Sequence, residues 1–271
     1  MQIFDTHCHY NLSPLLENWQ QHQQTATSAG VKKSLIVGTN LASSRQALEI
    51  VADNNSSLYA AIGIHPTEAM AIEDFDQTLQ ELTALTEVAQ VKAIGEIGLD
   101  FYRLATSLDP ITEIQKQEQL FIRQLELATR LQLPIVLHVR DQAETAYLRA
   151  LELYHRYASN HQQAVIFHCV SGPTTYLEKA LALPNSYFGF DGNLTFKNAS
   201  NIREIFTLVQ KRHPEKILLE TDAPYLAPEP HRGKVCEPAM IALTAAFAAA
   251  NLGADLEQIY HNSLQVFDLL S

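Results

Sequence analysis

Residues 131–141, LQLPIVLHVRD, hold a short apolar run, Pro134–Leu137, between two segments of helical character. The segment before it, Ile114–Leu131, carries apolar side chains at helical spacing, and Asp141–Tyr157 after it has the same spacing. A run this short and rich in β-branched residues is typical of a strand buried on both faces of a parallel sheet. The stretch therefore predicts a helix, a buried strand and a second helix in succession.

The same unit recurs along the whole chain. Seven further short apolar runs alternate with helical segments: Gln2–Asp5, Ser34–Val37, Leu58–Ile62, Val91–Gly95, Ala164–Phe167, Ser186–Phe190 and Ile217–Leu219. Two closing helices are predicted at Pro238–Asn251 and Asp255–Leu270. This alternation predicts an α/β fold, a (β/α)8 TIM-like barrel with residues 1–271 as a single domain. A doubly wound open sheet is the alternative, although no glycine-rich phosphate-binding turn follows the first run.

Composition and charge exclude several classes of protein. The 271 residues include 30 acidic and 19 basic side chains, a formal net charge of −11, which excludes a broadly basic, duplex-coating surface. Three cysteines are too few for a disulfide framework and predict a reducing compartment. The first residues lack the features of a secretory signal, and the longest apolar stretch, 242–250, is too short to span a bilayer. We expect a cytoplasmic protein with no membrane partner and no obligate protein partner.

Polar side chains that suit metals gather at the ends of the predicted strands. They are His7, His9, Glu96, His138, His168 and Asp222. In an α/β barrel the carboxyl ends of the strands form the face that carries the chemistry. The two histidines of the first strand are two residues apart, so both imidazoles face the same side and Cys8 faces away. Converging neutral imidazoles are what a divalent metal requires.

Each of these residues alone has an ordinary structural explanation. A single histidine at a strand end is more often a core or capping residue than a ligand, and Glu96 or Asp222 could cap the following helix. Six polar groups crowded on one face would nevertheless be costly without a metal to satisfy them. Six ligands also exceed the three usual for one catalytic zinc, so the set suits two metals about 3.5–4 Å apart. The sequence therefore predicts a dinuclear site that activates water for hydrolysis.

Other residues beside the strand ends are candidates for binding substrate. Four are basic and suit phosphate, although any one of them alone is more often a solvated loop charge or the partner of a nearby acid: Arg103, Arg140, Arg232 and Lys234. His65 could donate to substrate or simply end its strand before a proline. Nearby rings could stack nucleobases or pack against the barrel: Phe101, Tyr102 and Tyr225. Glu220 should face the same side of its strand as Asp222 and could orient a ligand.

Several motifs together resemble the TatD-type metal-dependent hydrolases, a deoxyribonuclease branch of the amidohydrolase-like barrels. They are FDTHCH at 4–9, GIHP at 63–66, IGEIGLDFYR at 94–103, LPIVLHVRD at 133–141, FHCVSG at 167–172, GFDGNLTFKNA at 189–199, LLETDAPYLAP at 218–228 and EPHRGK at 229–234. The match covers nearly the whole chain. The chain departs from the family pattern at Val139, Val235, Cys236 and Gln265, and these departures bear on substrate preference.

The resemblance implies a dinuclear centre in which all six candidate side chains are ligands and Glu96 bridges the ions. It implies zinc, manganese or magnesium as the metal, and hydrolysis of DNA phosphodiester bonds, often from a 3′ end. Asp222 would accept the proton of the attacking water. The acidic net charge favours single-stranded DNA ends as the partner, because few phosphates then need neutralising.

Two other functions remain open at this point. A small-molecule amidohydrolase or lactonase would use the same metal centre, because a polarised C=O and a polarised P=O need the same electrophile. Basic side chains directed into the mouth of the barrel would favour the phosphodiester. A metal-stabilised binding module is a weaker alternative, because structural zinc sites are usually closed and four-coordinate.

Overall fold

The predicted runs form one parallel sheet in the computed structural model, which describes residues 2–52, 57–102, 104–158 and 162–270. Within these residues the sheet has eight strands, and they follow one another in chain order. The strands are β1 Ile3–Cys8, β2 Val31–Val37, β3 Leu58–Ile62, β4 Val91–Asp100, β5 Ile135–Arg140, β6 Val165–Phe167, β7 Ser186–Phe190 and β8 Ile217–Leu219. Every neighbouring pair is parallel, as strand–helix alternation requires.

The first and last strands meet and close the sheet into a barrel. A parallel bridge joins Cys8 to Ala223, and the amide of His9 donates to the carbonyl of Ala223 over 2.8 Å. The amide of Asp222 likewise donates to the carbonyl of His7 over 2.9 Å. The barrel prediction is therefore confirmed, and the doubly wound open sheet is excluded because an open sheet would leave these two strands as separate edges.

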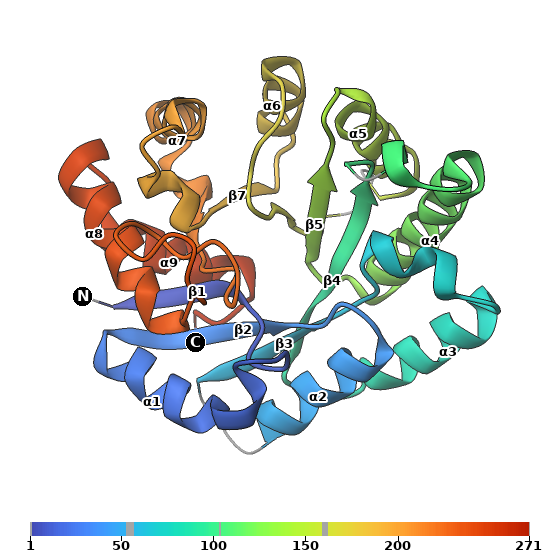
Figure 1. Cartoon of the computed structure of the whole chain (residues 1–271), viewed down its shortest axis with the longest axis horizontal. Helices are drawn as coiled ribbons and strands as arrows, with labels where there is room; N and C mark the ends of the chain where they lie inside the picture. The colour runs from blue at the N-terminus through green and yellow to red at the C-terminus, as the bar shows by residue number, and fades with distance from the viewer. Residues whose placement is uncertain (1, 53–56, 103, 159–161, 271) are drawn as a thin grey trace.

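Helices cover the outside of the barrel (Figure 1). They are α1 Trp19–Ser28, α2 Leu41–Ala52, α3 Phe75–Leu85, α4 Pro110–Leu131, α5 Thr145–Tyr157, α6 Thr174–Leu181, α7 Ser200–Arg212, α8 Ile241–Leu252 and α9 Leu256–Val266. Short 3-10 turns occupy η1 Leu16–Asn18, η2 Pro66–Ala71, η3 Leu104–Thr106, η4 Gly192–Thr195, η5 Pro214–Lys216 and η6 Pro238–Met240. No helix within the described ranges is both long and apolar enough to cross a membrane.

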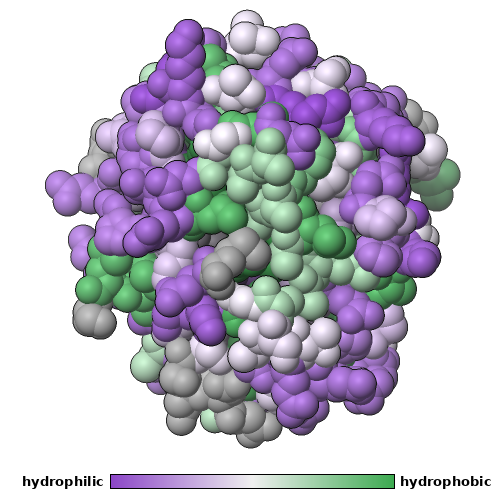
Figure 2. Space-filling model, turned by 90° about the vertical axis from the view of Figure 1, so that its left-hand side faces the viewer, coloured by the Kyte–Doolittle hydropathy of each residue, from purple (hydrophilic) through white to green (hydrophobic). Residues whose placement is uncertain are grey.

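The alanine-rich helix α8 gives one side of the molecule a mixed surface. Its inner residues, Ile241, Ala245 and Ala248, are buried, while Leu243 is 37% exposed. The face of the molecule on which α8 lies shows hydrophobic colour bordered by hydrophilic side chains (Figure 2). The wide apolar surface of this helix is therefore only partly covered by the barrel.

Two strands are longer than their apolar runs. β4 continues past Gly95 to Asp100, and β5 continues to Arg140, because the two strands remain paired from Gly98↔His138 to Asp100↔Arg140. Glu96 and His138 therefore lie inside strands rather than at their ends as predicted. In β4 the polar Glu96 and the small Gly98 interrupt the apolar pattern, although Ile97 and Leu99 are fully buried. In β5 the ladder of backbone hydrogen bonds continues past the buried residues.

The inside of the barrel is apolar at one end and polar at the other. Apolar side chains from nearly every strand form one packed cluster inside the barrel: Phe4, Leu35, Val37, Ala61, Ala93, Val136, Ile166 and Leu218. Val266 and Phe267, at and after the end of α9, pack below them. This packed layer forms a floor that does not depend on the polar groups above it, which lie near the carboxyl ends of the strands.

Gly98 should be essential to the pairing of β4 with β5. Its φ is +148°, and an added Cβ would overlap the carbonyl oxygen of His138. We expect Gly98→Ala to lower the free energy of unfolding by about 2–3 kcal/mol, measured by urea denaturation. Gly233 is the control, because it has a positive φ of +85° but no atom within 4 Å of an added Cβ. Gly233→Ala should cost only about 1 kcal/mol, and an equal loss in both variants would contradict this account.

Candidate metal centre

The six predicted side chains converge at the carboxyl ends of the strands, with Glu96 in the middle. Its Oε1 lies 2.8 Å from Nδ1 of His138 and 3.6 Å from Nε2 of His168, and its Oε2 lies 3.6 Å from Nε2 of His7. The Glu96 side chain is only 5% exposed. A buried carboxylate surrounded by three imidazoles is an electrostatically demanding arrangement that needs positive charge.

His7 and His9 act as a pair on β1 and just beyond it. Their Nε2 atoms face one another at 3.2 Å, and Nε2 of His9 lies 3.3 Å from Oδ1 of Asp222. Cys8 points the other way and its thiol donates to the carbonyl of Leu35, as the alternation of an extended chain requires. Asp222, in the loop after β8, thus places its carboxylate next to the two histidines of the first strand.

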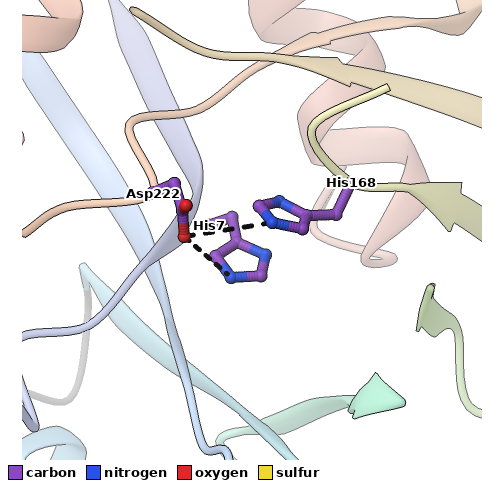
Figure 3. A group of neighbouring side chains, drawn as sticks. All are labelled: His7, His168 and Asp222. Carbon is purple, nitrogen blue, oxygen red and sulfur yellow. Dashed lines mark ion pairs between the residues drawn. The ribbon is translucent and has the colours of Figure 1, made fainter. Parts of the chain in front are cut away.

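His168, after β6, completes this side of the cluster. Its ring stacks on the ring of His7 with 3.6 Å between the centroids. Oδ1 of Asp222 lies 3.7 Å from Nε2 of His7 and 3.9 Å from Nε2 of His168 (Figure 3). Asp222 holds this position with a φ of +55°, a left-handed conformation that is uncommon outside glycine and clusters at functional sites.

Three of the four imidazoles have an acceptor on the nitrogen that faces away from the cluster. Nδ1 of His9 lies 2.8 Å from the carbonyl oxygen of Val37, and Nδ1 of His168 lies 2.8 Å from Oε1 of Glu220. Nε2 of His138 lies 3.4 Å from Oδ2 of Asp100. An N–H donated outward leaves the inner nitrogen with a free lone pair, which is the arrangement that metal-binding histidines show.

The donor set fits divalent cations. Ligands at 2.0–2.1 Å from a tetrahedral zinc lie about 3.3 Å apart, close to the 3.2 Å between the Nε2 atoms of His7 and His9. Among the residues that the structure describes, four overlapping groups could each hold an ion: His7, His168 and Asp222; His7, His9 and Glu96; Glu96, His138 and His168; and His65, Asp100 and His138. Glu96 belongs to two of these groups, so one carboxylate can serve two neighbouring sites.

The pKa values show how the cluster balances its charge without metal. Burial lowers the pKa of His138, but Asp100 and Glu96 outweigh burial and raise the pKa to about 9. Burial is likewise outweighed at His168, whose pKa rises to about 10 because of Glu220, Glu96 and Asp222. Burial alone would raise the pKa of Glu96, yet the imidazoles around it hold the pKa well below its usual range. Without metal, protons on the histidines therefore balance the negative charge of the carboxylates, and a metal ion must displace these protons in order to bind.

His65 lies beside the cluster but in a different role. It is the N-cap of η2, and its Nδ1 accepts a hydrogen bond from the amide of Thr67. The proton of the neutral ring is therefore on Nε2, which lies 3.8 Å from Oε1 of Glu96. Burial, and then the charge of His138, lower the pKa of His65 to about 4, so the ring is neutral at physiological pH. This imidazole presents an N–H donor to the site rather than a lone pair.

Two carboxylates near the centre were not predicted. Asp100 contacts His138, and the buried Asp5 accepts hydrogen bonds from the amide and hydroxyl of Thr221 over 2.9 and 2.7 Å. Burial is the main reason that the pKa of Asp5 rises to about 8. The signal for both was present, because Asp5 lies two residues before His7 and Asp100 lies four after Glu96, on the same face of each strand.

The predicted substrate-binding cations that the structure describes lie around the mouth, but no hydrogen bond or ion pair of the described residues joins them to the cluster. Arg140 is exposed and stacks on the ring of Tyr102, and Arg232 is exposed and stacks on the ring of Phe196. Lys234 is also exposed. Arg103 lies outside the described residues.

The four departures from the family pattern lie in different places. Val139 is half-buried in β5, Val235 is 47% exposed, and Cys236 is fully buried. Gln265 lines a cavity of about 390 Å³ with residues that precede β4, β5 and β6 or start them, such as Val91 and Pro134. That cavity lies at the amino ends of the strands, so Gln265 is at the opposite end of the barrel from the cluster.

Comparison with known proteins identifies the family. Residues 4–270 match the family model described as TatD related DNase. The chain belongs to this family. An uncharacterised metal-dependent hydrolase of Mycoplasma pneumoniae is 35% identical over 98% of this chain and 100% of its own length. A protein of Pantoea sp. named 3′-5′ ssDNA/RNA exonuclease TatD is 33% identical, again covering 98% and 100% of the two chains.

A solved structure agrees with this membership. The TatD homologue YjjV of Escherichia coli superposes with a TM-score of 0.82 at 28% identity, and 98% of each chain is covered. Family membership and the clusters of metal-binding side chains together make the protein a metal-dependent hydrolase of the TatD family. The TatD relationship thus agrees with the site, in which imidazoles and carboxylates converge at the mouth of the barrel.

Glu220 should tune metal binding through His168. Its side chain is fully buried, and its Oε1 also accepts from the amide of Cys169 over 2.6 Å. Glu220→Gln keeps the shape but removes the charge that orients the imidazole. We expect metal affinity to fall by ~10–100-fold, measured by competition with a chelator. Glu118→Gln, which breaks an ion pair with Arg149 on the outer helices, is the matched control and should leave affinity unchanged. Equal affinities in both variants would remove Glu220 from this role.

Proposed function

We propose that this TatD family member is a deoxyribonuclease that cleaves single-stranded DNA from its 3′ end with two divalent cations. The observation that carries the proposal is the buried Glu96 carboxylate with imidazoles on both of its oxygens. One ion would be held by His7, His9 and Asp222, and the other by His138 and His168, with Glu96 shared between them. A nitrogen-rich set favours zinc or manganese over magnesium.

The chain's own residues supply the remaining chemistry. The bound cations would act as Lewis acids toward the phosphate and would lower the pKa of a nearby water. Asp222 accepts the proton of the attacking water. Its side chain is 14% exposed, against 5% for Glu96 and 0% for Glu220, so it is the carboxylate of this group that water reaches most easily. The imidazoles beside it outweigh burial and lower its pKa, which keeps it ionised as a base.

His65 donates its Nε2 hydrogen to an oxygen of the scissile phosphate. A neutral donor suits this role because its proton does not depend on the charge of the cluster. Arg140, Arg232 and Lys234 bind the rest of the nucleotide chain from the rim, together with Arg103. These cations, and the naming of the Pantoea relative as a 3′-5′ ssDNA/RNA exonuclease, support a nucleic acid over a lactone or an amide as the substrate.

Metal removal tests the proposal. Stripping the protein with a chelator should abolish hydrolysis of a 5′-labelled single-stranded oligonucleotide but leave far-ultraviolet circular dichroism unchanged, because the apolar floor holds the barrel. Adding zinc, manganese or magnesium should restore activity, and affinity for the metal should rise with pH toward about 9 as His138 loses its proton. Full activity of metal-free protein would contradict the proposal. So would a remetallated enzyme that hydrolyses lactones or amides but leaves DNA intact.

Asp222→Asn separates metal binding from proton transfer. Asparagine keeps a ligating oxygen and tolerates the positive φ, so metal content should remain. The amide cannot act as a base, and we expect kcat to fall by ~10²–10⁴ with little change in KM. Asp255→Asn, at the N-cap of α9, is the control and should leave kcat unchanged. Near-normal turnover by Asp222→Asn with metal bound would exclude this carboxylate as the base.

A further inference from the structure

Two arginines at the mouth of the barrel are stacked on aromatic rings. The guanidinium carbon of Arg140 lies 4.0 Å from the ring centroid of Tyr102. The guanidinium carbon of Arg232 lies 4.1 Å from the ring centroid of Phe196. Both distances are well inside the limit of about 6 Å for a cation over a ring, so each guanidinium packs closely against its ring.

The two pairs lie on different sides of the metal centre. Tyr102 follows β4 and Arg140 ends β5, whereas Phe196 and Arg232 lie in the segments after β7 and β8. Because the strands follow chain order around the barrel, β6 separates the pairs on one side and β1–β3 separate them on the other. In Figure 1, β4 and β5 accordingly lie on the right, and α7 and α8, which continue from β7 and β8, lie on the left. The cluster around Glu96 is thus between the two pairs.

The charge of both arginines is left without a carboxylate partner. Four arginines on the outer helices each pair with an acidic side chain: Arg45 with Glu81, Arg123 with Asp76, Arg149 with Glu118 and Arg212 with Glu178. Among the described residues, no carboxylate lies within ion-pair distance of Arg140 or Arg232. In a chain with a net charge of −11, two cations beside the centre remain available for an anionic ligand.

Local hydrogen bonds hold the pairs in place. Nη1 of Arg232 donates to Oδ1 of Asn198 over 3.0 Å, and the amide of Glu229 ties the same loop to Oγ1 of Thr195 over 2.8 Å. On the other side the amide of Tyr102 donates to Oδ1 of Asp100 over 3.0 Å. Tyr102 as a whole residue is still 40% exposed. Both pairs are therefore ordered before any ligand arrives, which lowers the entropic cost of binding.

We propose that these two pairs, the Tyr102/Arg140 pair and the Phe196/Arg232 pair, are stacking platforms for nucleobases on either side of the scissile bond. The inference rests on the proposed function and adds that the enzyme recognises bases, not only phosphates. A guanidinium packed against a ring offers its other face to a base, and this mode of binding tolerates any sequence. Paired bases in a duplex do not expose their faces, so the platforms select single strands.

The proposal is tested by combining variants of the protein with oligonucleotides that lack single bases. Tyr102→Leu and Arg232→Gln each remove half of one platform, and Arg232 is exposed, so that variant should fold. Each variant and the wild type are assayed on a single-stranded oligonucleotide and on copies that lack one base at each position near the 3′ end in turn. We expect each variant to raise KM ~10-fold on the intact strand with kcat unchanged. On the copy that already lacks the base over that platform, the same variant should have no further effect.

The control is Tyr157→Leu, because Arg156 also lies over this ring, at 5.5 Å, but on α5 and away from the mouth. It should leave KM for the intact strand unchanged. Equal effects of a variant on intact and base-lacking strands would overturn the platforms and show that the arginines bind phosphates. Failure of the wild type to cleave any oligonucleotide would overturn the proposed function and this inference together, whereas cleavage with unchanged KM in both variants would overturn the inference alone.

Discussion

The buried carboxylate of Glu96 imposes the constraint on which the rest of the site depends. It lies inside β4 with imidazoles against both oxygens, in a place where water cannot screen its charge. Without cations, His138 and His168 must carry protons to balance it. A site built this way binds positive charge strongly, and divalent metals satisfy its lone pairs better than protons do.

Groups that contact the outer nitrogens of the histidines fix the orientation of the imidazole rings. The carbonyl of Val37 and the carboxylate of Asp100 each accept from the outer nitrogen of a histidine, and Glu220 forms an ion pair with the outer nitrogen of His168. Asp5 holds Thr221 next to Asp222. Beneath them the apolar floor gives these side chains a fixed base. The candidate metal-binding groups thus lie in strands or directly after them, and the positions of these strands are set by packing.

Much of the fold and of the cluster could be predicted from the sequence. Short β-branched runs between helical segments predicted the barrel, and period-two spacing predicted that His7 and His9 face the same side. The continuation of β4 to Asp100 was not predicted, because Glu96 and Gly98 interrupt its apolar pattern, although Ile97 and Leu99 are buried. The tautomer of His65 and the stacking of Arg140 on Tyr102 depend on contacts made only in three dimensions. By contrast, the sequence does show that Asp5 lies two residues before His7, on the same face of the strand. This spacing could have identified Asp5 as a further group near the cluster.

The central claim is that two cations share Glu96. Diffraction data collected at the zinc absorption edge, from crystals of the protein grown with zinc, test it most directly. The account predicts two anomalous peaks about 3.5–4 Å apart, both within bonding distance of the Glu96 carboxylate. One peak should adjoin His7 and His9, and the other His138 and His168. A single peak, or peaks that do not contact Glu96, would contradict the account.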